Sequence, residues 1–322
     1  MKLIGFDTVQ AVVQIADLFE PIRQSLIDFS SDKLIAAPIN LLHFDHRADA
    51  HIKIAALKGH PYFSIKVATM FPNNVTKGLA INQGAILLFD AQTGVPVAFI
   101  EDRGLLTDFR TGVAGALATQ AATQTDSLTL AVLGTGAQAY YQVMATSQLQ
   151  KIKELVIYGR NVANAQRLQE RLIQSIPYLV QSRIVNSPEK AVKSAEVIIC
   201  ATSSQQALIH GDWLCSGQHI TAVGADDTYK CELAPSCFMR ADQIYLDSLE
   251  SNMCYGEYRL ALAENPLLLN KTVELGQAFI NQQKVDRNVI SIAKLVGLGV
   301  QDLVTASTIF SKISSIENDI LS

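Results

Sequence analysis

The stretch from Ser127 to Tyr140, SLTLAVLGTGAQAY, decides the fold of the second half of the chain. An apolar run ends at Leu133 and leads directly into a glycine-rich turn, Gly134 to Ala139, which is followed by a helical pattern. A strand, a G-x-G-x-x-A turn and a helix in this order are typical of a dinucleotide-binding unit. The alternative is a simple glycine-rich turn. The strand before the turn and a second strand at the expected distance favour dinucleotide binding.

Each small residue of the turn has its own physical role. Gly134 allows a tight turn, Gly136 lets the backbone approach a pyrophosphate, and Ala139 permits close packing of the helix on the strand. The start of the helix offers free N–H groups and the positive end of its dipole to the phosphates. The predicted cofactor-binding residues of this turn are Gly134, Thr135, Gly136, Ala137 and Gln138.

The end of the second strand indicates which nicotinamide cofactor is bound. In NAD-binding proteins an acidic residue about 20 positions after the turn accepts a hydrogen bond from the ribose 2′-hydroxyl. Here the strand ends in Tyr158-Gly159-Arg160-Asn161, without an acidic residue. Gly159 leaves room and the Arg160 guanidinium suits a 2′-phosphate, so the sequence favours NADPH over NADH. The alternative is that Arg160 is a solvated loop residue and that NADH is accepted as well.

Apolar strands alternate with amphipathic helices through this region, which predicts an α/β fold with a Rossmann-type doubly wound parallel sheet. Strands are expected at Leu128 to Leu133, Leu155 to Tyr158, Ser182 to Val185, Val197 to Ala201, Ile220 to Val223 and Ile244 to Leu246. Helices are expected to open near Ala137, Val162, Pro188 and Cys231, and the last helices at Ser291 and Asp302.

The first part of the chain has a different pattern, which predicts an α+β domain with a mixed sheet. Residues 1–30 carry apolar side chains at helical spacing and are expected to form a helix. Strands are expected around Ile35 and at Ile39 to Phe44, Tyr62 to Thr69, Ala85 to Asp90 and Val97 to Glu101, before an Ala-rich helix at Asp108 to Thr123. We therefore predict a first domain at 1–115, a Rossmann domain at 116–300, and a C-terminal helix at 301–322 that returns to the first domain.

The bulk composition excludes several classes of partner. The 322 residues carry a net charge of −4 and a pI near 5.9, and no Lys/Arg-rich block is present, so neither nucleic acid nor a membrane surface is an expected partner. No signal peptide and no apolar stretch of spanning length is visible. The five cysteines form no C-x-x-C pair, which favours a reducing compartment, and we expect the protein in the cytoplasm.

Lys66 and Arg110 are the basic residues that raise a functional question. Lys66 shares one strand face with Ser64 and Ala68, so it is either solvated or directed into a polar site, where burial would lower its pKa and suit it to proton transfer. Thr107 has the character of an N-cap, which would place Arg110 in the first turn of a helix, beside the positive end of the dipole. A bound carboxylate would remove that conflict.

The alternative for Arg110 is a structural ion pair with Asp102 or Asp108. Asp226 and Asp227 follow a predicted strand through Gly224 and Ala225, at the edge of a parallel sheet where ligands bind. A carboxylate there could hold a substrate amine or exchange its proton, and the alternative is a turn or capping aspartate.

Four histidines lie close together in sequence and raise the question of a metal ion. His43, His46, His51 and His60 are interleaved with Asp45 and Asp49. The run H-F-D-H supplies an i, i+3 pair but no H-E-x-x-H and no matching third ligand. We therefore expect no metal site.

Four ordered stretches resemble the ornithine cyclodeaminase and mu-crystallin family over nearly the whole chain. They are Ile65 to Val67 with Phe71 to Asn74; Asp102 to Thr111; Leu133 to Gln138; and Ala222 to Asp226 with Lys230, Glu232 and Leu233. The resemblance implies a homodimer whose N-terminal domain, with the C-terminal helix, binds substrate and forms the dimer interface, while the Rossmann domain holds the cofactor.

The resemblance also implies roles for individual residues. Lys66 corresponds to the active-site lysine near the reacting Cα–N bond, Arg110 to the clamp on the substrate carboxylate, and Asp226 to the acid that handles the substrate amine or its proton. Thr111 joins the predicted cofactor-binding residues. Many members carry a further carboxylate-binding Arg after a proline, whereas Pro38 is followed here by Ile39-Asn40. Lys53, in a stretch similar to iminosuccinate-type reductases and ectoine-utilisation proteins, is the expected substitute.

Three functions are compatible with these residues. The favoured one is an NAD(P)H-dependent imino-acid reductase or amino-acid dehydrogenase, which acts at the Cα–N bond of a small amino or imino acid. An ornithine cyclodeaminase would return the hydride to a cyclised imine and release ammonia. A catalytically idle, ligand-binding protein of the crystallin type is the third, and the presence of Lys66, Arg110 and Asp226 argues against it.

Overall fold

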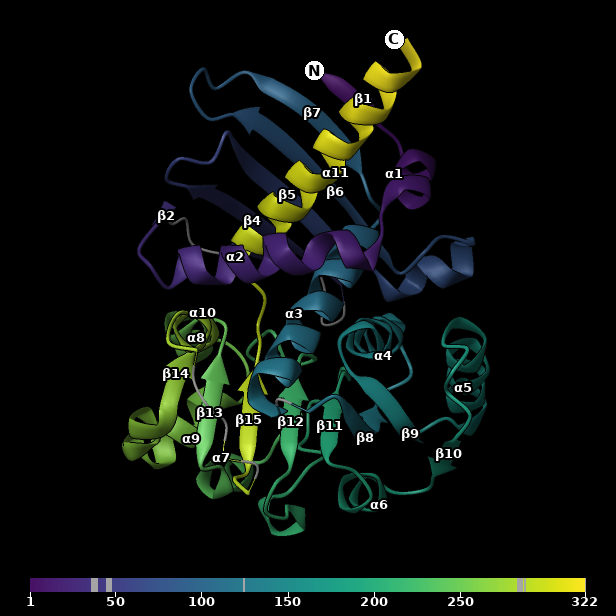
Figure 1. The fold of residues 1–322 in the computed structure, drawn as a ribbon, viewed down its shortest axis with the longest axis vertical. Helices are drawn as coiled ribbons and strands as arrows, with labels where there is room; N and C mark the ends of the chain where they lie inside the picture. The colour runs from purple at the N-terminus through teal and green to yellow at the C-terminus, as the bar shows by residue number, and fades with distance from the viewer. Residues whose placement is uncertain (36–39, 45–47, 124, 283–285, 287, 322) are drawn as a thin grey trace. The chain divides into compact units, whose positions relative to one another are not determined.

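The computed structural model describes residues 1–35, 40–44, 48–123, 125–282, 286 and 288–321. The chain divides into two compact units, the first formed by Met1–Arg110 with Leu298–Ser322 and the second by Thr111–Gly297 (Figure 1). The first division, like the predicted limit at 115/116, falls inside helix α3 (Leu105–Thr123). Pro38, Ile39, Asp45 and His46 lie outside the described residues.

The second unit is built on a parallel sheet whose eight described strands lie in the order β10-β9-β8-β11-β12-β15-β13-β14. The strands are β8 (Ser127–Leu133), β9 (Lys151–Tyr158), β10 (Ser182–Val185), β11 (Val197–Cys200), β12 (His219–Ala222), β13 (Gln243–Leu246), β14 (Thr272–Glu274) and β15 (Ser291–Lys294). The order reverses between β8 and β11, and ligands bind at such a switch point, beyond the carboxyl ends of the strands. The predicted Rossmann-type doubly wound sheet is confirmed.

Helices cover both faces of this sheet (Figure 1). Besides part of α3, they are α4 (Ala137–Leu149), α5 (Val162–Ser175), α6 (Pro188–Lys193), η3 (Gly211–Trp213), α7 (Pro235–Arg240), α8 (Leu249–Cys254), α9 (Tyr258–Glu264), η4 (Pro266–Lys271) and α10 (Leu275–Ile280). Starts at Ala137, Val162 and Pro188 are as predicted. In α5 the Asn161 side chain caps the helix by accepting a hydrogen bond from the Asn164 N–H.

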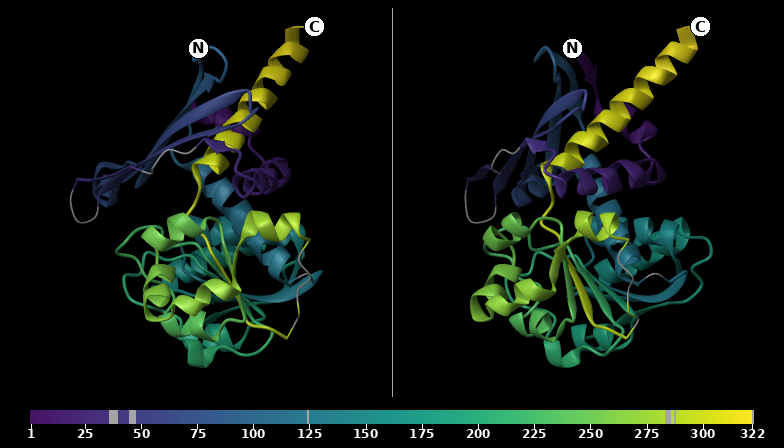
Figure 2. Two further views of the ribbon diagram at one scale, coloured as in Figure 1. Left: turned by 90° about the vertical axis from the view of Figure 1, so that its left-hand side faces the viewer. Right: turned by 60° about the vertical axis from the view of Figure 1, so that its left-hand side comes forward.

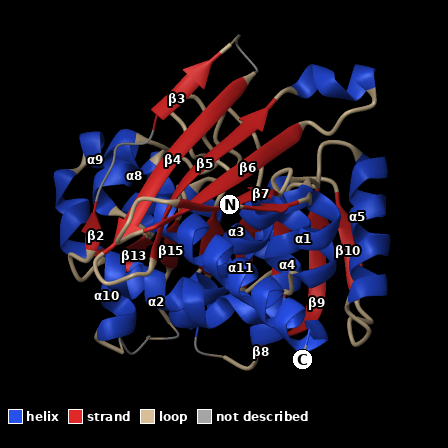
Figure 3. Ribbon diagram, turned by 90° about the horizontal axis from the view of Figure 1, so that it is seen from above, coloured by secondary structure: helices blue, strands red, loops and turns tan. Residues whose placement is uncertain are grey.

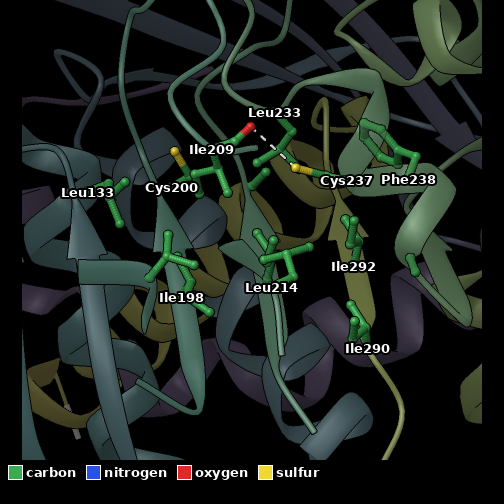
Figure 4. Packing of buried hydrophobic residues seen from close by; sticks show 14 of the residues in the cluster. Leu133, Ile198, Cys200, Ile209, Leu214, Leu233, Cys237, Phe238, Ile290 and Ile292 are labelled. Carbon is green, nitrogen blue, oxygen red and sulfur yellow. Dashed lines mark hydrogen bonds between the residues drawn. The ribbon is translucent and has the colours of Figure 1, made fainter. Parts of the chain in front are cut away.

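The core of this unit explains why its strands appear as continuous apolar runs. Paired positions on neighbouring strands form a row that crosses the sheet and is fully buried, and its members are Ala131, Ile198, Ile220, Ile292 and Ile244. Figure 4 shows Ile198 and Ile292 within the larger cluster, which includes Phe238 and Leu214. Because helices cover both faces, both faces of each strand must be apolar.

Two predictions in this unit are wrong. Ser291 begins the strand β15 and not a helix, because its backbone pairs with both β12 and β13 in the middle of the sheet. A four-residue segment carries too little periodicity to distinguish the two. The helix expected near Cys231 begins later, at Pro235, since Leu233 is held extended by a bridge to Ile209 and the proline ring favours the first helical turn.

The first unit contains a mixed sheet whose order is β1-β7-β6-β5-β4-β2, with β3 paired to β4, and strands β4 to β7 lie side by side in Figure 3. The pair β1 and β7 is parallel and the others are antiparallel. The strands are β1 (Lys2–Ile4), β2 (Leu34–Ile35), β3 (Asn40–His43), β4 (Asp49–Leu57), β5 (Tyr62–Met70), β6 (Asn82–Asp90) and β7 (Pro96–Glu101). An α+β unit with a mixed sheet is as expected.

The long C-terminal helix α11 (Gly299–Leu321) packs on this sheet against β4 and β5 and against α2 (Phe19–Phe29), as Figure 2 shows. The other helices of the unit are α1 (Phe6–Val12), η1 (Ile15–Leu18), η2 (Pro72–Lys77) and the start of α3.

The single helix expected over residues 1–30 is wrong. A strand precedes α1, and the chain becomes extended at Val13, where φ is −69° and ψ is 131°, before η1 and α2 follow. Strand β4 was not expected at all. Its inward positions include Asp49 and Lys53, whose charges hide the two-residue apolar alternation of a half-buried strand.

Candidate active site

Lys66 and Lys53 lie at one end of a buried row of paired residues in the first unit. The row consists of Ile4, Ile100, Ile86, Lys66 and Lys53 on five neighbouring strands. Lys66 is 2% exposed and Lys53 is 6% exposed. The interpretation of Lys66 as a solvated lysine is therefore wrong. Because paired residues of antiparallel strands project to the same side, both ammonium groups lie on the buried face.

Asp302, in the first turn of α11, links the two basic residues singled out from the sequence. Its Oδ1 lies 2.7 Å from Lys66 Nζ and 3.0 Å from Arg110 Nε, and its side chain is 2% exposed. Lys66 Nζ also donates to Thr107 Oγ1 at 3.2 Å. One carboxylate oxygen therefore holds both cations.

Arg110 is bound along one edge of its guanidinium. Its Nε donates to Asp302, and its Nη1 donates to Gln301 Oε1 at 3.2 Å. Nη2 makes no hydrogen bond with the described residues, so the outer edge of the fork can receive a planar anion. Helix α3 begins at Leu105, so Thr107 is not an N-cap and Arg110 lies beyond the first turn. The suggested ion pair with Asp102 or Asp108 is also wrong, because the partner is Asp302.

Burial and charge act in opposite directions on the titrating groups of this cluster. Burial lowers the pKa of Lys66, and Asp302 partly opposes that shift while Arg110 adds to it. Burial disfavours the ionised form of Asp302, but Lys66, Arg110 and Lys53 outweigh it and lower the pKa of that carboxyl. Burial raises the pKa of Asp102. The cluster therefore combines an ionised aspartate with a lysine whose proton is unusually easy to remove.

The glycine-rich turn of the second unit has the conformation that its sequence predicts. Gly134 follows β8 with a φ of +123°, and its N–H donates to the Tyr158 carbonyl at 3.0 Å. A Cβ at Gly134 would lie 2.2 Å from the Ala201 carbonyl oxygen, so the end of β8 can approach β11 only without a side chain. Ala139 is fully buried where α4 packs.

Gly136 tests whether the turn fits a dinucleotide. Its φ of −87° is accessible to any residue, and a Cβ there would meet no protein atom within 4 Å. Nothing within the protein therefore requires glycine at Gly136. A pyrophosphate against the backbone N–H groups at the start of α4 would require it, so the turn fits the cofactor. Gly159 is needed for a different reason, because a Cβ there would lie 2.4 Å from Thr135 Cγ2.

The remaining predicted cofactor residues occupy different positions around this turn. Ala137 and Gln138 form the first residues of α4. Arg160 is exposed after β9, and it has no hydrogen-bond or ion-pair partner among the described residues. Thr111, in α3, accepts a hydrogen bond from Gln142 Nε2 through its carbonyl at 2.8 Å.

Asp226 and Asp227 have different environments beyond the carboxyl end of β12. Asp227 Oδ1 accepts hydrogen bonds from the N–H groups of Tyr229 and Lys230, each at 2.7 Å, so this residue is the turn aspartate. Asp226 Oδ1 lies 2.7 Å from Lys230 Nζ, and its side chain is 37% exposed. Burial disfavours the ammonium of Lys230, but Asp226 and Asp227 outweigh it and raise its pKa. Asp226 therefore presents a paired, accessible carboxylate at the sheet edge.

Buried charges support the turn that carries Asp226. Glu232, fully buried, accepts hydrogen bonds from Thr202 N at 2.6 Å and from Gly224 N at 2.7 Å, which joins the segments after β11 and β12. Lys294, also fully buried, donates to the Ala225 carbonyl at 2.6 Å. Its ion-pair partner is Glu257, at 3.8 Å, whose pKa burial raises to about 7.

Sequence reasoning missed Asp302 and the buried charges beneath Asp226. The sequence indicates Asp302 only as the start of a helix, although an acidic residue in a helix expected to return to the first domain is a usable signal. Glu232 is part of one of the stretches that resemble the family, but the sequence predicts no role for its side chain. Glu257 and Lys294 are separated by more than thirty positions and belong to no local pattern, so only the fold brings them together.

The described residues of the histidine segment contain one close pair of a histidine and an aspartate. His51 Nε2 lies 3.6 Å from Asp49 Oδ1. Across the described residues, no group of three or more His, Cys, Asp or Glu side chains could hold a metal ion. Also within those residues, no helix has the length and apolarity to cross a bilayer.

Comparison with known proteins identifies the family. The model of the ornithine cyclodeaminase/mu-crystallin family matches residues 4–317, so the chain belongs to this family. An uncharacterized cyclodeaminase of Sinorhizobium fredii is 32% identical, and the match covers 83% of this chain and 81% of the relative. A putative dehydrogenase of Rhizobium meliloti is also 32% identical, with coverage of 83% and 82%. A Δ1-pyrroline-2-carboxylate reductase of Bacillus cereus is 26% identical, with coverage of 97% and 96%.

Solved structures share the fold over almost the whole chain. Thermococcus litoralis Δ1-pyrroline-2-carboxylate reductase, in complex with NADH and L-proline, has a TM-score of 0.90 at 23% identity and covers 98% of both chains. The iminosuccinate reductase of Paracoccus denitrificans, in complex with NAD⁺, has a TM-score of 0.89 at 22% identity, covering 98% and 97%. An archaeal alanine dehydrogenase dimer with bound NAD has a TM-score of 0.89 at 22% identity, covering 98% and 96%.

Proposed function

We propose that the protein is an NAD(P)H-dependent oxidoreductase that acts at the Cα–N bond of a small α-imino or α-amino acid. The observation that carries the proposal is the buried cluster in which Lys66 and Arg110 share one oxygen of Asp302. A proton donor and a carboxylate clamp are thereby held together. The family membership and the nucleotide-binding turn supply the second requirement, a nicotinamide cofactor.

The basic side chains of the first unit suit a substrate carboxylate. Arg110 has an unbound edge of its guanidinium, and planar bidentate binding of carboxylates is the particular strength of arginine. Lys53 adds a second buried cation beside Asp302. We assign the carboxylate to Arg110, with Lys53 in the role of the arginine that many relatives carry after a proline.

We assign the handling of the substrate nitrogen and its proton to Lys66 and Asp226. The cofactor, when bound, supplies a hydride to Cα of the imine. As the new Cα–H bond forms, the electron pair of the C=N π bond moves to nitrogen, which takes a proton from the Lys66 ammonium. A lysine whose pKa is lowered by burial is suited to that donation. Asp226 would bind the amine of the product through its carboxylate.

For the cofactor we propose NADPH in preference to NADH, held by Gly134, Thr135, Gly136, Ala137, Gln138, Arg160 and Thr111. The preference is supported by the exposed and unpaired Arg160 at the end of β9. We expect Arg160→Ala to weaken NADPH by roughly ten- to a hundredfold, the loss of a charge-assisted contact, and NADH by less than twofold. Titration of protein fluorescence with each cofactor measures both affinities. Equal weakening of the two would remove Arg160 from the 2′-phosphate.

We also propose a homodimer formed through the outer face of the first unit's sheet. An outer row of paired residues crosses that face, and all its members are large and apolar: Leu3, Phe99, Leu87, Ile65 and Ile54. Leu3 is 73% exposed and Ile54 is 37% exposed in the isolated chain. A continuous apolar sheet face of this kind is typical of an interface. We place the dimer in the cytoplasm, consistent with five free cysteines.

Ornithine cyclodeamination is the second candidate, and the relative described as a cyclodeaminase favours it. The two functions separate in one set of assays with purified protein. Cyclic imino acids, or small 2-oxo acids with ammonia, should cause stoichiometric oxidation of NADPH if our proposal holds. Release of ammonia from L-ornithine with catalytic NAD⁺, and no net oxidation of NADPH, would replace it with the cyclodeaminase. Binding of cofactor without turnover of any substrate would indicate the idle, ligand-binding alternative.

A further inference from the structure

Asp302 is the acidic residue at the centre of the cluster in the first unit. We infer that Asp302 is a positioning residue of the reaction, which aligns Arg110 for the substrate carboxylate and keeps Lys66 protonated for transfer to the imine nitrogen. The inference rests on the proposed function and adds a residue to it.

The carboxylate of Asp302 contacts both cations of the cluster. Oδ1 of Asp302 is the acceptor for Lys66 Nζ at 2.7 Å and for Arg110 Nε at 3.0 Å. Gln301, the preceding residue on α11, accepts from Arg110 Nη1 at 3.2 Å. Two neighbouring residues of one helix therefore fix the guanidinium along one edge, while Asp302 alone also reaches Lys66.

Oδ2 of Asp302 takes no part in the contacts with Lys66 and Arg110. It is buried and has no hydrogen-bond partner among the described residues. A buried acceptor without a partner is costly unless a ligand or a proton reaches it. An oxygen kept unsatisfied beside the reacting lysine is available for a proton or for a substrate N–H.

The charged groups with the largest effects on Lys66 are Asp302, Arg110 and Asp102. Asp302 projects from α11, Arg110 from α3 and Asp102 from the segment before α3, while Lys53 lies opposite Lys66 on β4. Asp302 is the only one of the described acidic side chains in an ion pair with Lys66. Its removal leaves burial and Arg110, which both favour the neutral amine, opposed mainly by Asp102, whose effect is smaller.

The decisive variant is Asp302→Asn, which keeps the shape and removes the charge. In the reductive direction the ammonium form of Lys66 is required, so activity falls on the alkaline side as Lys66 loses its proton. We expect the alkaline limb of kcat to move to lower pH by about 1–3 units in Asp302→Asn, the usual effect of losing one close opposite charge. KM for the imino acid should rise as well, because the hydrogen bond from Arg110 Nε loses its charged acceptor and holds the guanidinium less firmly.

Three further variants separate positioning from general stability. Gln301→Leu loosens Arg110 without contact to Lys66, so KM should rise while the alkaline limb stays in place. Asp17→Asn removes a different ion pair of α11, that of Asp17 with Lys312 at 2.6 Å, and should change neither. Asp302→Glu restores the charge and should return the limb toward the wild-type pH.

A direct titration of Lys66 gives a readout that does not depend on turnover. Protein labelled with ¹³C at lysine Cε, with the Lys66 signal assigned by its loss in Lys66→Met, should show Lys66 titrating at lower pH in Asp302→Asn than in wild type. The inference fails if that titration and the alkaline limb are both unchanged, or if Asp17→Asn shifts the limb equally. Wild-type protein that reduces no imino acid but shows the expected NMR shift would overturn the proposed function and leave only the electrostatic role of Asp302.

Discussion

In Arg110 one edge of the guanidinium is bound to α11 and the other is left for a ligand. We expect Arg110→Ala to lower kcat/KM for the imino acid by roughly a hundredfold or more, because truncation of one partner of a buried charge pair costs about 2–5 kcal/mol. The loss should appear mainly in KM. Steady-state kinetics measure it, with NADPH affinity as the control, and an unchanged KM would remove Arg110 from the substrate carboxylate.

His219 supplies a prediction about stability that is independent of the site. Its Nδ1 and Nε2 are each 2.9 Å from a hydroxyl, that of Ser291 and that of Thr221, and burial lowers its pKa to about 3. The folded protein thus holds a neutral ring, while the unfolded chain binds a proton near pH 6.5. This contribution to stability is complete above pH 6.5 and is lost progressively as the pH falls toward 3.

The expected size of that effect is about 2 kcal/mol between pH 7 and pH 5, from linkage applied to this one residue. Urea unfolding of wild type and His219→Gln at the two pH values measures it. The variant, which cannot titrate there, should lose about 2 kcal/mol less than wild type over this interval. An equal loss in both proteins would show that His219 is not the group responsible.

The candidate site was predictable at the residue scale where a local pattern exists. The two-residue alternation of β5 predicts that Lys66 lies on the face opposite Ile65 and Val67. The structure shows this arrangement. Asp302 has no such pattern. It reaches Lys66 only because a helix that begins more than two hundred residues later packs on β4 and β5.

At the scale of elements, the turn between β8 and α4 contains two glycines, and a different physical reason accounts for glycine at each position. A Cβ at Gly134 would collide with the Ala201 carbonyl, whereas one at Gly136 would meet no protein atom within 4 Å. We expect Gly134→Ala to destabilise the protein by about 2–4 kcal/mol through strain and overpacking. Gly136→Ala should leave the melting temperature unchanged and weaken NADPH by roughly tenfold, about 1.4 kcal/mol.

Calorimetry and cofactor titration on the two variants test that distinction. Normal cofactor affinity in a stable Gly136→Ala protein would mean that the backbone there does not approach the pyrophosphate.

Elements were predictable from the sequence in proportion to their local signals. Helices α4, α5 and α6 begin at the predicted residues, because a glycine turn, an asparagine cap and a proline mark those starts. Strands β4 and β15 were missed for two different reasons. The first carries lysine and aspartate on its buried face, and the second is a four-residue segment defined by its two neighbours in the sheet.

At the scale of the whole molecule, the outer row predicts assembly. We expect wild type to be a dimer and Leu87→Arg, at the centre of the row, to be monomeric, since a charge in an apolar interface is not solvated. Val180→Arg, at an exposed position of the second unit, is the matched control. Light scattering after gel filtration measures the mass. A dimeric Leu87→Arg protein, or a monomeric wild type, would contradict the proposed interface.

The most direct test of the central claim is the destination of the cofactor's hydride. Purified protein with a cyclic imino acid and NADPH carrying deuterium on the transferred position of C4 should yield an amino acid with one deuterium at Cα, seen by mass spectrometry and NMR. Arg110→Ala should form that product far more slowly. An unlabelled product, or oxidation of NADPH that does not depend on the imino acid, would contradict reduction at the Cα–N bond.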